Sequence, residues 1–253
     1  MEMNIQNRLL SIRSQNYINE LPMFVKERGF VFSENQIEKD ILITGFNPSF
    51  LENEKEKRED EKGKIDSFNF HDVLRAKKPG KYFSSLKKLI FDPGNNIDLI
   101  NRTAYVDIFY FREKNQSSFK KDILKSPAGI RFAVDQLNLT QHAIEDVIKP
   151  KVIIVKNKES AAYWGKLASK GLIWMGYQLD FIDNLLCGEL FKISGLLNSP
   201  ERIAPEITDT NLKDSLVLFS QYRNQYTSKK EPTATVINGL LENYFQSKNE
   251  LSK

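Results

Sequence analysis

The alternation of apolar and polar positions along the chain predicts short strands separated by helices. Four apolar runs rich in β-branched or aromatic residues, each bounded by turn formers, predict buried strands. These runs are 41–43, 103–111, 151–155 and 188–194, the last of which is expected to end the core sheet. Because parallel strands need crossover helices, the order predicts an α/β fold. We expect three α/β/α layers around a central, mainly parallel four-stranded sheet.

Apolar residues at helical spacing predict the helices that surround this sheet. The predicted helical segments are roughly 4–20, 84–91, 127–147, 159–171, 208–228 and the segment that follows Pro232. No internal repeat is visible. The pattern therefore predicts a single domain over 1–253, with a core of about 38–228, an N-terminal helix and a C-terminal helical extension.

The composition indicates a protein of the cytoplasm. No apolar run approaches the roughly 18 residues that a membrane span needs, and the N-terminus lacks the layout of a signal peptide. Cys187 is the only cysteine, which excludes an intramolecular disulfide and disfavours an iron–sulfur cluster. Only two histidines are present, which disfavours a zinc site. We expect no metal and no cofactor.

The charge balance is mild, with 37 Lys and Arg against 33 Asp and Glu, a net charge of +4. This value alone does not indicate a nucleic-acid-binding protein. Basic clusters at 75–81, 119–125 and 149–158 would form a track for phosphates only if the fold brings them together. The mixed-charge segment 51–64 has almost no apolar residues, which predicts a solvated loop or frayed helix.

The first predicted strand runs directly into a turn that carries polar chemistry. Gly45, Asn47 and Pro48 follow the apolar run, and all three favour turns. Ligands of open α/β sheets bind beyond the carboxyl ends of the strands. The turn is therefore the first candidate for a functional site.

Five segments, taken in order, resemble the motifs of one protein superfamily. They are GFNPS (45–49), PGKYFSSLKKL (79–89), VDIFYFR (106–112), KPKVIIVKNKESA (149–161) and LNSPERI (197–203). Together they resemble the uracil-DNA glycosylase superfamily, especially its mismatch-type branch with a G-x-NP motif, over roughly 38–225. The third strand of that branch usually ends in Gly-Lys, and Asn157 stands here in place of the glycine.

The resemblance implies a monofunctional DNA glycosylase. Such an enzyme flips its target nucleotide out of the stack and hydrolyses the N-glycosidic bond through an oxocarbenium-like sugar. Because that cation needs little base strength from the attacking water, the amide of Asn47 would suffice to position it. Phe46 and Pro48 would shape the loop, and Gly45 would border the base. The alternative for Asn47 is an Asx-Pro turn without a catalytic role.

Aromatic residues and lysines near the second motif are candidates for contacts with the flipped nucleotide. A flat apolar wall would stabilise the base by stacking, at about 1–3 kcal/mol per base. The candidates for this wall are Phe68, Phe70, Tyr82 and Phe83. Lys78 and Lys81 would neutralise the neighbouring phosphates. The alternatives are ordinary core aromatics and solvated lysines.

Asp107 departs from the pattern, since the matching position of the superfamily is commonly Asn. An ionised Asp only accepts hydrogen bonds. It would repel O4 of uracil or thymine and suit the amino group of cytosine. Three alternatives remain open: a buried Asp107 could be protonated, could cap a loop, or could pair with Arg112.

The last motif also departs, because relatives often carry a His that stabilises the leaving base. Here Asn198 and Ser199 are the neutral donors at that place. Leu196 or Leu197 is expected to wedge into the gap left by the flipped base, with Pro200 beside it and Arg202 on the facing strand or a phosphate. The alternative is a simple strand-to-helix turn.

These departures predict a glycosylase with altered base specificity. A cytosine-type base fits Asp107, and a modified cytosine, hydroxymethylated or glucosylated, would spare the host and direct the enzyme against phage DNA. The alternatives are a uracil or mismatch repair glycosylase and a catalytically inactive DNA-binding relative. The expected partner is DNA, duplex or single-stranded, with no membrane, and the protein is expected to be a monomer.

Overall fold

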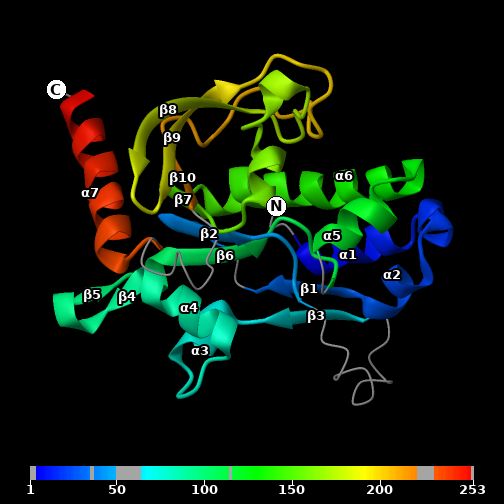
Figure 1. Ribbon diagram of the computed structural model, residues 1–253, viewed down its shortest axis with the longest axis horizontal. Helices are drawn as coiled ribbons and strands as arrows, with labels where there is room; N and C mark the ends of the chain where they lie inside the picture. Colours follow the sequence, from blue (N-terminus) through cyan, green and yellow to red (C-terminus); the bar gives the residue numbers. More distant parts are fainter. Residues whose placement is uncertain (1–3, 35–36, 50–63, 114–115, 221–230, 252–253) are drawn as a thin grey trace.

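The structure is a computed structural model that describes residues 4–34, 37–49, 64–113, 116–220 and 231–251 (Figure 1). Its centre is a six-stranded sheet with the strand order β6-β2-β7-β10-β9-β8. None of the helices in the described part of the chain has the length and apolarity that a membrane-spanning segment requires.

The strands of the central sheet are β2 (Ile41–Gly45), β6 (Thr103–Asp107), β7 (Val152–Val155), β8 (Tyr177–Leu185), β9 (Gly188–Leu196) and β10 (Leu216–Ser220). Two smaller sheets consist of β1 (Phe30–Ser33) with β3 (Ile65–Phe68), and of β4 (Phe91–Asp92) with β5 (Ile97–Asp98).

The α-helices are α1 (Ile5–Arg13), α2 (Met23–Arg28), α3 (Phe70–Arg75), α4 (Lys81–Ile90), α5 (Gln116–Ser118), α6 (Pro127–His142) and α7 (Ala234–Leu251). Short 3-10 helices are η1 (Asn16–Glu20), η4 (Pro93–Asn95), η5 (Ile100–Arg102), η8 (Glu159–Trp164) and η9 (Ala168–Lys170), and π-helical turns are η6 (Phe119–Ile123) and η7 (Ala143–Ile148).

The sheet is mixed, which corrects the expected four-stranded sheet. The strands β6, β2, β7 and β10 are parallel to one another, and β9 and β8 continue the sheet as an antiparallel hairpin. The fold is therefore α/β, as predicted, but with two strands more than the apolar pattern indicated. The strand β9 was predicted as 188–194, whereas β8 was missed because much of it is exposed and its sequence is only weakly apolar, and β10 was expected to be helical.

Helices cover both faces of this sheet. One core cluster joins the sheet to α1 and α6, and a second joins it to α3, α4 and α7. Figure 1 shows α6 on one side of the strands and α3 with α4 on the other. Successive residues of each strand alternate between the two clusters, as the pleat of a strand requires.

Local chemistry explains where the principal helices begin. Ser126 caps α6 by accepting a hydrogen bond from the backbone N–H of Gly129 at 3.0 Å, and Pro127 occupies the first helical position. The helix α4 begins directly after Pro79 and Gly80, and it buries Leu86, Leu89 and Ile90 on one side. Its opposite side is left for solvent or for a site.

The predictions of two helices are wrong. The segment 208–228 was expected to be helical, but 216–220 forms β10, an almost fully buried strand between β7 and β9. Burial between two strands overrides the helical spacing there. The segment 159–171 forms two 3-10 helices interrupted at Gly165, which has a φ of +94°. Helices in 84–91, in 127–147 and after Pro232 are confirmed.

The small parallel sheet of β1 and β3 lies beside the carboxyl end of β6 (Figure 1). The chain segment 108–113, which continues from β6, connects the two sheets. On one side its amides donate to the carbonyl oxygens of Gly45, Phe46 and Pro48, and on the other its Tyr110 carbonyl accepts from Val31. This segment fixes the geometry of the site described next.

Candidate functional site

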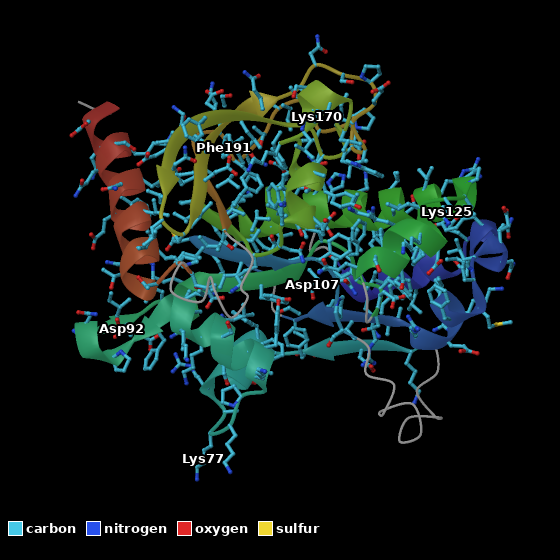
Figure 2. All side chains as sticks on the ribbon, in the orientation of Figure 1. Lys77, Asp92, Asp107, Lys125, Lys170 and Phe191 are labelled. Carbon is cyan, nitrogen blue, oxygen red and sulfur yellow. The ribbon has the colours of Figure 1, made fainter. Side chains whose placement is uncertain are left out.

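A cavity of about 1490 Å³ opens at the carboxyl ends of β2, β6 and β7. From β2 the chain crosses to β6 on one side and afterwards to β7 on the other. The cavity thus lies where the direction of winding reverses, the usual ligand site of open α/β sheets. Figure 2 shows Asp107 close to the middle of the molecule at this place.

A close contact between Gly45 and Asp107 forms the floor of the cavity. The two residues are register partners on β2 and β6. A Cβ atom on Gly45 would lie 2.0 Å from Oδ1 of Asp107 and 2.7 Å from the hydroxyl of Tyr105. Only glycine therefore leaves room for the carboxyl group at this point of the strand.

A chain of hydrogen bonds holds this carboxyl group. The hydroxyl of Tyr105 donates to Oδ1 of Asp107 at 2.7 Å, and the hydroxyls of Tyr82 and Tyr105 lie 2.9 Å apart. Because Tyr105 has a single hydroxyl hydrogen and donates it to Asp107, Tyr82 must be the donor to Tyr105. No hydrogen bond among the described residues reaches the second carboxyl oxygen, Oδ2.

Burial controls the protonation of Asp107. The residue is 8% exposed. Desolvation raises the pKa of its carboxyl from 3.8 to about 7, against the hydrogen bond from Tyr105, which lowers it. Both ionised and protonated Asp107 are therefore populated near neutral pH. The protonated acid, one of the alternatives left open by the sequence, thus remains relevant. The alternative pairing with Arg112 is not observed, since Arg112 lies 3.5 Å from Asp66 instead.

The turn after β2 fixes the side chain of Asn47. Its Nδ2 donates to the carbonyl oxygens of Pro48 at 2.9 Å and Glu113 at 2.8 Å. Since both partners are acceptors, the amide nitrogen must face them, and Oδ1 must face away. Within the described part of the chain, no donor reaches this Oδ1. Asn47 lines the cavity and thus offers it a fixed acceptor.

Glu113, which orients Asn47 through its carbonyl, is itself held by a buried ion pair. The carboxylate of Glu113 lies 2.5 Å from the guanidinium of Arg28 at the end of α2. The guanidinium also lies over the ring of Phe24, 4.7 Å from its centroid. The N-terminal part of the chain therefore supports the turn that carries Asn47.

One residue at the end of each of three neighbouring parallel strands forms a row, which we call the edge row. Its members are Asp107 on β6, Gly45 on β2 and Lys156 directly after β7. Gly45 pairs with Asp107, and Lys156 follows the pair Thr44–Val155 and donates its amide to Thr44 at 3.1 Å. The residues two positions earlier, Tyr105, Ile43 and Ile154, belong to the cluster beneath α3, α4 and α7. Because side chains alternate along strands, the edge row faces that same side.

Lys156 is held in this position by an ion pair. Its Nζ lies 3.2 Å from Oε1 of Glu231, and the two side chains are only 14% and 15% exposed. Both residues line the cavity. A charged lysine and a carboxylate are thus placed at the opposite side of Gly45 from Asp107.

The helix α4 supplies a polar wall to the cavity. Lys81, Ser84, Ser85 and Lys88 all line it, at positions that share one side of the helix. Arg112 and Lys156 also line the cavity, together with the acids Asp66, Asp107 and Glu231. The lysines of the α4 wall suit the phosphates of a nucleic acid.

The structure brings most of the sequence-predicted residues around the first motif to the cavity. The predicted residues that line it are Gly45, Phe46, Asn47, Pro48, Phe68, Lys81, Tyr82, Phe83 and Asp107. Tyr82 is 48% exposed, so its ring is accessible to a ligand, whereas the ring of Phe46 is buried against Phe109 and Phe119.

Two other candidates lie away from the cavity. Phe70 is 3% exposed and stacks on Tyr105, with ring centroids 5.3 Å apart, so it supports the wall from behind. Lys78 is exposed in the turn between α3 and α4, next to Lys77, which Figure 2 shows at the tip of that turn. DNA binding by Lys78 remains a prediction.

The residues of the last motif do not line the cavity, so their contact with the base remains a prediction. Because β9 is antiparallel to β10, it begins at the carboxyl edge with Gly188 paired to Ser220 and runs away from it. The segment after β9 packs instead on Trp174 and Gly176. The residues displaced in this way are Leu197, Asn198, Ser199, Pro200 and Arg202, none of which lines the cavity. The segment that follows the carboxyl end of β10, 221–230, lies outside the described residues.

Several residues of the site were not found from the sequence. Lys156 could have been found, since it continues the alternation of Val152 and Ile154 at the end of an apolar run. Tyr105 could have been found in the same way from its spacing to Asp107. Glu231 and the pair of Arg28 with Glu113 carry no local signal. In the described part of the chain, no group of three or more His, Cys, Asp and Glu gathers as a metal site.

Comparisons with known proteins add no assignment. No protein-family model matches the chain, and neither a curated protein nor a solved structure matches it. What the site does must therefore be inferred from its own geometry.

We predict that Gly45→Ala will destabilise the protein by about 1–3 kcal/mol, because the new methyl group would force Asp107 away from Tyr105 and leave buried polar groups unpaired. Denaturant unfolding would measure the change. Gly239→Ala in α7 is the matched control, since a Cβ there meets nothing within 4 Å and should stabilise the helix by about 0.5–1 kcal/mol. Equal effects at both positions would contradict the close contact.

We predict that Asp107→Asn will stabilise the protein increasingly as the pH rises from about 4 to about 7. The pKa of Asp107 is raised on folding, so the wild type loses stability as pH rises from the unfolded pKa, 3.8, through the folded pKa, about 7. The full difference corresponds to about 4 kcal/mol. Unfolding free energies of both proteins across this pH range would measure it. Parallel stability curves would rule out the raised pKa.

Proposed function

We propose that the protein is a monofunctional DNA glycosylase that flips out a modified cytosine and hydrolyses its N-glycosidic bond. The observation that carries the proposal is the fixed amide of Asn47, whose Oδ1 accepts from no donor among the described residues and which lines the same cavity as the buried acid Asp107. The ordered motifs that resemble the uracil-DNA glycosylase superfamily, and the α/β/α arrangement around four parallel strands, support this class.

Asn47 would position the attacking water. A water that donates one hydrogen to Oδ1 turns a lone pair away from the amide, toward a sugar carbon in the cavity. An oxocarbenium-like sugar reacts with water without strong base assistance, so an orienting acceptor is sufficient. The hydrogen bonds to Pro48 and Glu113 keep the amide in one orientation before the substrate arrives.

The floor of the cavity presents acceptors to the base. Asp107 Oδ1 is occupied by Tyr105, so Oδ2 remains, and the hydroxyl hydrogen of Tyr82 is directed at Tyr105, so its oxygen can only accept. An edge with donors, such as the amino group of cytosine, matches this floor when Asp107 is ionised. Uracil and thymine present O4 at the same place and would be repelled.

The surroundings suit a flipped nucleotide. The accessible ring of Tyr82 and the ring of Phe68 offer surfaces for stacking, and the cations of α4 suit its phosphates. The cavity of about 1490 Å³ exceeds the roughly 300–1,000 Å³ of ordinary ligand pockets. The additional space would admit a hydroxymethyl or glucosyl group on the base. Excision limited to such bases would spare host DNA and act against phage DNA.

One observation favours a second candidate, excision of uracil or a mismatched base. With a pKa of about 7, Asp107 is partly protonated near neutral pH and could then donate a hydrogen bond to O4. This activity would fall as the pH rises through 7, whereas excision of a modified cytosine would increase over the same range.

A cleavage assay would test the proposal. Labelled oligonucleotides would carry uracil, a G·T mismatch, cytosine, hydroxymethylcytosine or glucosylated hydroxymethylcytosine, and alkali would break the abasic sites. We expect breakage only at the modified cytosines. Asn47→Ala should lower the rate at least about 100-fold, and Asp107→Asn should lower the preference over uracil by about 10- to 100-fold.

Asn184→Ala on the exposed strand β8 is the matched control and should retain the wild-type rate. Breakage at uracil that Asp107→Asn leaves unchanged or improves would assign the protein to repair. Absence of breakage on the whole panel, with DNA binding retained in Asn47→Ala, would identify an inactive DNA-binding relative.

A further inference from the structure

The edge row places an acid and a base on the two strands that flank β2. The space above Gly45 is taken by Oδ1 of Asp107 and the hydroxyl of Tyr105, so a flat ring that enters the cavity meets this carboxyl group, with Lys156 on the far side of Gly45. Neighbouring strands lie about 4.8 Å apart, so the Cα atoms of Asp107 and Lys156 are separated by roughly 10 Å. A pyrimidine ring and an extended lysine side chain together span this separation.

The floor also sets the direction in which the ring lies. In cytosine the amino group and the O2 carbonyl flank N3 on opposite sides. A base that directs its amino group to Asp107 therefore turns O2 toward the other end of the edge row, where Lys156 lies. O2 is adjacent to N1, the atom bonded to the sugar, so negative charge that develops on N1 is shared with O2.

We propose that Lys156 is a catalytic residue of this site and donates a hydrogen bond from its ammonium group to O2 of the departing base. The inference rests on the proposed glycosylase function. When the bond between the sugar C1′ and N1 breaks, its electron pair passes to the base and spreads onto O2. The water held by Asn47 gives its oxygen to C1′ and releases a proton, which neutralises the base. Lys156 keeps its own proton throughout.

Glu231 holds Lys156 ready for this role. The ion pair at 3.2 Å compensates the ammonium group inside the cavity and limits its rotamers. Of the other cations that line the cavity, Lys81 and Lys88 extend from α4 and Arg112 lies close to Asp66. None of these three belongs to the edge row. Lys156 is therefore the cation that the sheet itself places opposite Asp107.

The test compares leaving bases of different quality in single-turnover excision. 5-Formylcytosine leaves more readily than hydroxymethylcytosine, because its carbonyl group withdraws electrons from the ring. Lys156→Gln should lower the rate on hydroxymethylcytosine by about 100- to 1,000-fold. On 5-formylcytosine the loss should be smaller, about 10- to 100-fold. Lys156→Arg should restore part of the loss. Lys158→Gln, which removes an exposed charge two residues away, should leave both rates within about twofold of wild type.

A second measurement separates catalysis from folding and binding. DNA with a 2′-fluoro substituent at the target sugar resists cleavage, and Lys156→Gln should bind it within about threefold of the wild-type Kd. The double variant Lys156→Gln with Glu231→Gln removes both charges of the ion pair and should show the same dependence on the leaving base. An equal loss of rate on both bases, or a loss accounted for by weaker DNA binding, would overturn the role of Lys156 and leave the proposed function standing. A wild type that excises neither base would overturn the proposed function, and the inference with it.

Discussion

The contact between the backbone of Gly45 and the carboxyl group of Asp107 is the constraint on which the site depends. It requires that β2 carry no side chain where β6 directs an acid across it. Tyr105 then holds one carboxyl oxygen in place and leaves the other for a ligand. One glycine thus fixes the place of the acid.

The second constraint is the anchoring of the turn that carries Asn47. An amide side chain on a free turn would sample several orientations and would hold a water poorly. Here the turn pairs with 108–113 on one side, and the side-chain amide of Asn47 donates both of its hydrogens to carbonyl oxygens. The carboxylate of Glu113 is fixed by Arg28. The chemistry at the turn therefore depends on residues that do not touch the cavity.

The sequence was sufficient for the parts whose signal is local. Turn formers after an apolar run located Asn47, the resemblance of 106–112 to a family motif singled out Asp107, and continuous apolar runs located the parallel strands that carry them. It failed for β10, whose residues have helical spacing but are buried between two strands, and for the direction of β9, which displaced Asn198 from the cavity. Pairing direction depends on contacts between distant segments. For the same reason, no local pattern could indicate that Glu231 meets Lys156.

The pairing of 108–113 with β1 has a consequence for the smallest part of the chain that could work by itself. By apolar pattern alone, the sheet and its crossover helices begin near residue 38. A shortened chain that begins there would keep those strands but would lose β1 and Arg28. Segment 108–113 would then have an unpaired edge, and local opening would reach the turn before the rest of the sheet. The shortest segment that folds would then be shorter than the shortest segment that is active.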